Sequence, residues 1–143
     1  MIKVIRDVDL WWAKVKEPVS PFGSEQWELQ VRTTDDDKIA ELVKVGIKMK
    51  KDEEGVSFGN LKRPVVKRNG ERNDPPKVVD AALNDIDVLI GNGSKGHVKV
   101  FTYDYNVNGR SGIGCQLVAI QVIDLIEYSA GGDDFKVEDN GEF

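Results

Sequence analysis

The amino-acid sequence predicts an all-β domain that contains one inserted helix and ends in a disordered acidic tail. Most of the chain alternates apolar and polar residues with the period of two that is typical of strands. One stretch, residues 34–51, has the spacing of an amphipathic helix instead. Residues 131–143 are glycine-rich, strongly acidic and too polar to pack. We therefore expect a folded domain over residues 1–130, followed by the tail.

The composition is that of one small globular domain, with 143 residues of which 40% are hydrophobic and 31% charged. Cys115 is the single cysteine, which excludes an internal disulfide and favours a reducing, intracellular setting. With His97 as the single histidine, a four-ligand zinc site of the usual kind is nearly excluded. No apolar run approaches the ~20 residues of a membrane-spanning helix. We expect no membrane association and no cofactor.

The first expected element is a strand over about residues 7–16, where apolar and polar residues alternate. The adjacent Trp11 and Trp12 must then point to opposite faces. Since Trp12 shares the parity of Val8 and Leu10, we expect Trp12 in the core and Trp11 on the free face, where it can line a groove.

A loop, a second strand and the helix follow. Residues 17–25 contain two prolines and a glycine, and Phe22 lies at the tip of this loop, where it has no obvious core to join. The alternative is that its ring folds back onto the barrel. Residues 26–33 alternate cleanly and predict a half-buried strand. Thr34 or Asp35 can cap the helix, and Gly46 on its buried stripe would allow a close approach to a sheet.

The second half of the chain predicts further strands. Residues 52–60 are expected to form a loop, and residues 61–83 two short basic strands around a hairpin, with Pro64 at an edge or a bulge. A strand over 95–105, a flexible loop over 106–112 and a buried, curved strand over 113–128 complete the chain. Five to seven antiparallel strands with one helix describe a small barrel. The OB-fold, a five-stranded Greek-key barrel, is the usual architecture of this kind that binds oligonucleotides.

Charge is distributed unevenly along the chain. The formal net charge is −5, and the tail alone carries −4, from five acidic residues and one lysine. Residues 62–77 carry six basic residues against two acidic ones. A basic stretch and an acidic end favour a nucleic-acid surface with a detachable tail. Ordinary solvated surface charge is the alternative.

The segment 97–105 carries the most informative chemical signal. Alternation places on one face His97, Lys99, Phe101, Tyr103 and Tyr105. Aromatic rings and a lysine on one face, followed by a loop that contains Arg110, form a platform on which bases stack whatever their identity. The alternative is that the rings fill the core while the intervening valines face a second layer.

Catalytic signatures are missing. The sequence has no G-x-S-x-G motif and no phosphate loop that ends in G-K-S/T. Residues 35–37 are three aspartates, which the first turn of a helix explains better than a metal site. The glycines of residues 91–96 fit a tight turn better than a phosphate cradle. We therefore expect no enzymatic activity and no metal.

The segment from residue 90 to Phe143 resembles the single-stranded DNA-binding proteins of short-tailed lytic coliphages. It contains a GNGSK turn that opens a strand, the aromatic segment FTYDY, a long apolar strand and an acidic tail that ends in phenylalanine. The Pro21–Phe22–Gly23 loop, the DDDKIAELVKVGI helix and the VVD at 78–80 extend the resemblance over most of the chain. The match is patchy over residues 50–77.

This resemblance implies an OB-fold that binds single-stranded DNA without sequence preference in phage replication, recombination and repair, within the cytoplasm of the infected bacterium. It also implies a homodimer whose acidic tail contacts the phage DNA polymerase and primase-helicase. Two DNA-contacting aromatic residues of the family correspond to Phe22 and Tyr105 here. At the position of a third such aromatic residue, this sequence has Val107. The family's basic contacts carry over loosely onto residues 62–68.

Residues and resemblance together give two candidate sets. The candidate DNA-binding residues are Phe22, Tyr105, Tyr103, Phe101, Lys99, Trp11, Lys62, Arg63, Lys67, Arg68 and Arg110. The candidate partner-binding residues of the tail are Asp133, Asp134, Glu138, Asp139, Glu142 and Phe143. The alternative functions are an OB-fold protein–protein interaction module with a DNA-mimicking tail, and a small hydrolase or nuclease. The joint presence of aromatic, basic and acidic segments favours single-stranded DNA binding.

Overall fold

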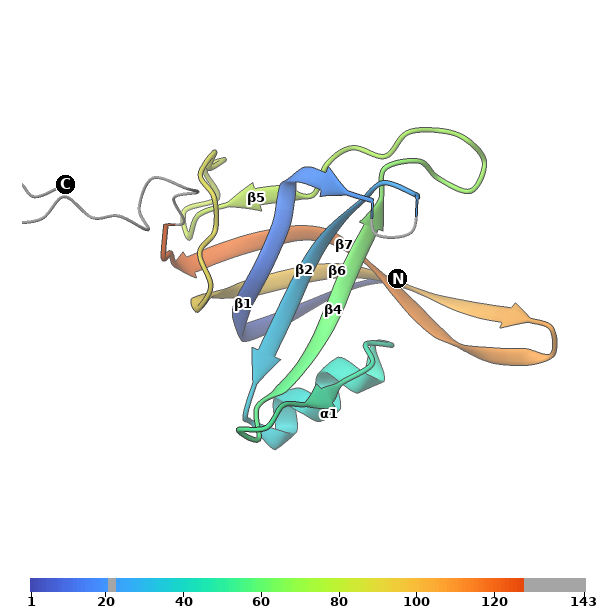
Figure 1. Ribbon diagram of the computed structural model, residues 1–143, viewed down its shortest axis with the longest axis horizontal. Helices are drawn as coiled ribbons and strands as arrows, with labels where there is room; N and C mark the ends of the chain where they lie inside the picture. The colour runs from blue at the N-terminus through green and yellow to red at the C-terminus, as the bar shows by residue number, and fades with distance from the viewer. Residues whose placement is uncertain (21–22, 128–143) are drawn as a thin grey trace, which may run out of the picture.

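The computed structural model describes residues 1–20 and 23–127. These residues form one mixed sheet of seven strands and a single helix (Figure 1). The elements are β1 (Ile2–Val19), β2 (Gln26–Thr33), α1 (Asp36–Lys44), β3 (Lys50–Lys51), β4 (Ser57–Pro64), β5 (Lys77–Val79), β6 (Ser94–Val107) and β7 (Arg110–Asp124). The strand order is β3-β4-β2-β1-β6-β7-β5, and every neighbouring pair is antiparallel except β5 and β7.

The sheet curls into a barrel, and the barrel closes where β4 approaches β7. A guanidinium nitrogen of Arg63 on β4 donates a hydrogen bond to the backbone carbonyl of Leu117 on β7, at 3.3 Å. The interior is filled by aliphatic side chains that are fully buried, among them Ile5, Leu10, Leu29, Leu61, Leu117 and Ile120. The five strands β1, β2, β4, β6 and β7 therefore form the expected OB-type barrel, with α1 inserted between β2 and β3.

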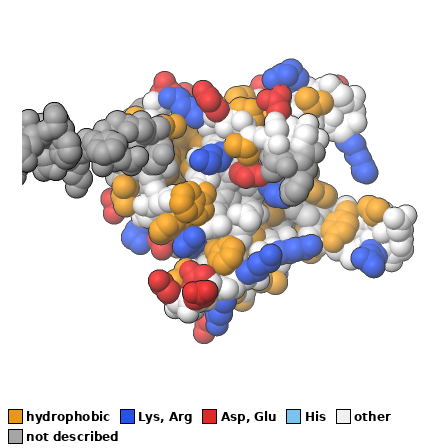
Figure 2. Space-filling view, in the orientation of Figure 1, with side chains coloured by type: hydrophobic (Ala, Val, Ile, Leu, Met, Phe, Trp, Pro, Cys, Tyr) orange, Lys and Arg blue, Asp and Glu red, His pale blue; other side chains and the backbone are white. Residues whose placement is uncertain are grey.

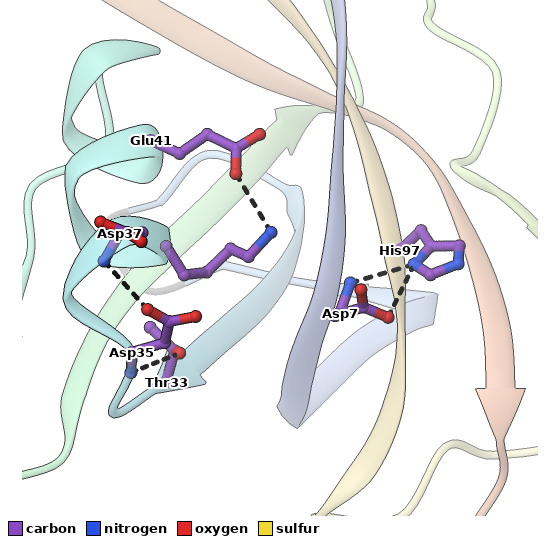
Figure 3. Close-up of polar contacts among 7 residues, drawn as sticks. Asp7, Thr33, Asp35, Asp37, Glu41 and His97 are labelled. Atoms are coloured by element: carbon purple, nitrogen blue, oxygen red, sulfur yellow. Dashed lines mark hydrogen bonds and ion pairs between the residues drawn. The ribbon is translucent and has the colours of Figure 1, made fainter.

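The strand β1 changes the face it buries twice, and this overturns the prediction that Trp12 belongs to the core. Asp7 and Trp12 have positive φ values of 60° and 47°. The pairing register shifts at both places, as it does at bulges. Trp12 is consequently 54% exposed, and the buried series resumes at Val15. The bulge at Asp7 is held by its backbone N–H, which donates to Nδ1 of His97 at 3.0 Å (Figure 3).

The helix α1 is shorter than the predicted span of residues 34–51. It is capped by Asp35, whose carboxylate accepts a hydrogen bond from the backbone N–H of Asp37 at 3.0 Å (Figure 3). It ends before Gly46, which has a φ of 99°. A Cβ on Gly46 would lie 2.5 Å from the carbonyl oxygen of Ile113 on β7. The expected close approach at this glycine is therefore present, although Gly46 lies outside the helix.

Three further segments differ from their predictions. The strand β4 begins at Ser57, inside the expected loop of residues 52–60. Residues 65–73 form a small turn with one bridge between Val66 and Arg72. The predicted hairpin partner β5 instead pairs in parallel with β7. This partner is distant in the sequence, so local patterns carry no signal for it.

The predicted flexible loop over residues 106–112 is a tight turn. Asn108 and Gly109 have φ values of 53° and 79°, and Val107 pairs with Arg110. Positive φ at both central residues is the signature of a two-residue hairpin turn. The N-terminal strand accompanies β6 only as far as Thr102, which exchanges backbone hydrogen bonds with Met1. Residues 103–114 pair with one another and project from the barrel (Figure 1). We call this ribbon the arm.

Candidate nucleic-acid interface

An exposed row of aromatic rings runs along the outer side of β6 into the arm. Phe101, Tyr103 and Tyr105 are 42%, 46% and 41% exposed, whereas Val98 and Val100 on the opposite side are fully buried. The rings of Phe101 and Tyr103 are stacked, with centroids 6.3 Å apart and planes inclined by 24°. The alternation predicted from the sequence is therefore present, and the rings do not fill the core.

Glycines on β7 support the tyrosines of this row. Tyr103 pairs with Gly114 and Tyr105 with Gly112. A Cβ on Gly114 would lie 2.6 Å from Cζ of Tyr103, and a Cβ on Gly112 would lie 2.6 Å from the hydroxyl oxygen of Tyr105. Each tyrosine ring thus lies against the backbone of a glycine. A side chain at either glycine would displace the ring. The part of each ring that remains exposed, beside the stacked ring of Phe101 in the case of Tyr103, is available to a ligand.

The basic turn of residues 65–73 borders the same surface. Lys67 and Arg68 line one pocket together with Tyr103 and Gln116. The space-filling view shows a notch between the lobe that carries this turn and the arm, with hydrophobic side chains (orange) along the arm (Figure 2). Lys67 also lies 3.9 Å from the carboxylate of Glu71. The structure therefore brings part of the predicted basic cluster next to the aromatic row; we call this hollow the notch.

Lys62 and Arg63, predicted together, have different surroundings. Lys62 is exposed on the outer side of β4. Arg63 donates from Nε to the carbonyl oxygen of Asp74 at 2.7 Å, in addition to its bond with Leu117. Burial lowers the pKa of Arg63, and the nearby carboxylate of Asp74 partly opposes this. Arg63 thus fastens the closure of the barrel, and its donors are directed at backbone carbonyls.

A second aromatic surface lies on the outer side of β1, β2 and β4. The guanidinium carbon of Arg32 lies 4.0 Å from the ring centroid of Trp11 and 5.8 Å from that of Phe58. Nε of Arg32 donates to Gln30 at 2.7 Å, which fixes the plane of the guanidinium. The sequence predicts Trp11 on the free face but not the contacts of Arg32 and Phe58. Arg32 follows the alternation of β2, but its place beside Trp11 depends on the pairing of two strands.

The remaining predicted residues are dispersed or lie beyond the described chain. Lys99 is exposed on β6 next to the aromatic row, and Arg110 is exposed beside the turn of the arm. Phe22 and the tail residues from Asp133 to Phe143 lie outside the described residues. Burial raises the pKa of the Cys115 thiol to about 11. Within residues 1–20 and 23–127, no group of three His, Cys, Asp or Glu side chains could hold a metal ion. In the same part of the chain, no helix is long and apolar enough to cross a membrane.

Comparison with known proteins finds similarity in structure but not in sequence. No protein-family model and no curated protein sequence matches the chain. The structure of gp2.5, a single-stranded DNA-binding protein of bacteriophage T7, superposes with a TM-score of 0.65 at 18% identity, over 100% of this chain and 98% of that one.

Two structures of the single-stranded DNA-binding protein of bacteriophage Enc34 are also similar. One, in complex with single-stranded DNA, has a TM-score of 0.59 at 10% identity and covers 91% of this chain and 89% of that one. The other has a TM-score of 0.60 at 8% identity and covers 99% and 90%. The chain thus has the OB-fold of these phage single-stranded DNA-binding proteins.

Proposed function

We propose that this protein binds single-stranded DNA without sequence preference and acts in phage DNA replication, recombination and repair. The observation that carries the proposal is the exposed row of Phe101, Tyr103 and Tyr105 beside the basic notch. Bases of any identity stack on aromatic faces, at about 1–3 kcal/mol each. In duplex DNA the bases face one another, so a row of this kind discriminates in favour of single strands.

The phosphates of the strand are proposed to pair with exposed basic side chains around the row. Lys67 and Arg68 border Tyr103 in the notch, while Lys99 and Arg110 lie at the two ends of the row. Phe22 in the loop between β1 and β2 is proposed to add a further ring. OB-folds bind oligonucleotides with this loop, with the loop between their last two strands and with the face between them. These elements correspond here to residues 20–25, the arm and the outer side of β2 and β4.

The outer side of β2 and β4 is proposed to extend the interface. Lys62 is exposed there. The guanidinium of Arg32 lies over Trp11 and 3.9 Å from the carboxylate of Asp52, so it holds the Trp11 ring in place as a stacking surface. We leave Arg63 out of the proposed interface, because its donors are directed at the carbonyls of Asp74 and Leu117. No step of this proposal involves catalysis.

The acidic tail is proposed to compete with DNA for the basic residues and to recruit replication proteins. Residues 131–143 carry a charge of −4 and remain tethered to the domain. Tethering gives the tail an effective concentration of order millimolar near the basic surface. DNA would displace it and release Phe143 and the surrounding carboxylates for the phage polymerase and primase-helicase. By the same resemblance, we propose that the protein acts as a homodimer.

Fluorescence anisotropy with a labelled oligo-dT, and with a duplex of the same length, tests the proposal. We expect tighter binding of the single strand, with an affinity that falls steeply with salt. Each phosphate contact contributes a log–log slope of about −0.7 for single strands. Equal affinity for the two ligands, or no dependence on salt, would contradict it. An interaction module without nucleic-acid affinity would bind neither ligand.

A further inference from the structure

A second basic pocket lies on the outer side of the sheet, beyond the end of the aromatic row. It is formed by β1, β6, β7, β5 and the segment after β5. Its main lining residues are Val4, Arg6, Lys77, Leu83, His97 and Lys99. Val4 and Leu83 are 43% and 68% exposed and supply an apolar floor. The pocket thus combines apolar surface with basic side chains that converge from separate strands.

The positive charge of this pocket is not neutralised by the described residues. Arg6, Lys77 and Lys99 take part in none of the ion pairs formed within residues 1–20 and 23–127, and no carboxylate lines the pocket. The carboxylate of Asp7 lies 3.9 Å from Nδ1 of His97. By contrast, Lys95 on the same strand is paired with Asp9 at 2.8 Å. Three cations without a counter-charge are suited to a ligand that brings several negative charges.

The pocket is continuous with the aromatic row along β6. His97, Lys99 and Phe101 are every second residue along β6 and therefore lie on the same side of the strand. From His97 to Tyr105 this side of the strand extends about 27 Å, at about 3.4 Å per residue. OB-folds contact about 4–16 nucleotides, so a strand stacked on the row has enough length to reach the pocket.

We propose that the single strand bound by the aromatic row continues into this pocket, where Arg6, Lys77 and Lys99 bind its phosphates. The floor of Val4 and Leu83 then contacts a sugar or base between those phosphates. This inference rests on the proposed function and extends its binding track from the arm along β6 to the pocket beside its N-terminal half. The ligand class is a phosphodiester strand long enough to span both surfaces.

The test compares two labelled oligo-dT ligands, one of about 5 nucleotides that covers the aromatic row and one of about 15. The variant is Arg6→Glu combined with Lys77→Glu. Lys48→Glu combined with Lys51→Glu is the control of equal charge change, because both lysines are exposed and neither lines the pocket or the notch. We expect the double variant to weaken binding of the long ligand about tenfold and to reduce the steepness of its salt dependence by about 1.4, from two lost phosphate contacts. Binding of the short ligand should change no more than in the control.

Three outcomes would overturn the inference. If the double variant binds the long ligand like the control, the strand does not enter the pocket. If it binds the long ligand more tightly than wild type, the pocket holds an acidic segment such as the chain's own tail. If wild type binds neither ligand, the proposed function fails together with the inference. Arg6→Gln with Lys77→Gln repeats the test without charge reversal, and circular dichroism verifies that both variants are folded.

Discussion

Lys62 and Arg63 are adjacent on β4 and yet point to different environments, which makes them a matched pair at the scale of single residues. Lys62 faces solvent, and Arg63 donates to the carbonyl oxygens of Asp74 and Leu117. Arg63→Ala should lower the free energy of unfolding by about 1–3 kcal/mol, because hydrogen bonds from a charged donor are lost. It should leave the affinity per folded molecule for oligo-dT unchanged.

Lys62→Ala should change DNA binding and leave stability unchanged. It should weaken binding of oligo-dT and make the salt dependence less steep by about 0.7, while the urea midpoint stays that of wild type. Urea denaturation and anisotropy on both variants separate the two roles. A loss of affinity in Arg63→Ala at unchanged stability would return this residue to the interface.

Cys115 is expected to be unreactive in the folded protein. Burial disfavours the charged thiolate, which raises the pKa of the thiol to about 11. Alkylation by iodoacetamide should therefore be slow at pH 8 and accelerate as the pH rises toward 11. In denaturant the thiol should react like an ordinary cysteine with a pKa of about 8.5. Mass spectrometry of labelled protein measures both rates, and rapid labelling of the folded protein at pH 8 would contradict the assignment.

At the scale of elements, the arm predicts that binding and stability can be separated. Tyr105→Ala should weaken binding of single strands by about 1–3 kcal/mol, and Phe22→Ala should do the same. The melting temperature of Tyr105→Ala should remain close to that of wild type, because this ring is 41% exposed.

Ile113→Ala is the matched control for Tyr105→Ala, since Ile113 pairs with Asp104 on the arm and is 48% exposed. It should leave the affinity intact. A sharp fall in the melting temperature of Tyr105→Ala, with unchanged affinity per folded molecule, would mean that this ring is structural and that the stacking surface lies elsewhere.

The elements also show what the sequence can and cannot predict. The strands β2 and β6 were predictable because their alternation is local and uninterrupted. The burial of β1 was not, because Asp7 and Trp12 adopt positive φ without being glycines. The contact of Arg32 with Trp11 and Phe58 joins three strands, so no single segment signals it.

For the whole molecule, removal of residues 131–143 is the decisive change. The truncated protein should bind oligo-dT more tightly, most clearly at low salt, where charges are least screened. It should also lose its association with the phage polymerase or primase-helicase, while the circular dichroism spectrum of the domain stays the same. A solubilising tail would instead leave the affinity unchanged at every ionic strength and preserve capture of the polymerase.

The projection of the arm has a consequence for how the molecule fluctuates. Beyond Thr102, which exchanges backbone hydrogen bonds with Met1, and the contact of Ile113 with Gly46, the outer part of the arm is held by its own hairpin ladder, and an isolated two-stranded ribbon is only marginally stable in water. The amides of the arm should therefore exchange with deuterium by local opening, far faster than those of β1 or β2, which are paired on both sides. A strand of DNA that bridges the arm and the barrel would suppress this opening. Protection of the arm on addition of oligo-dT would then report occupancy residue by residue.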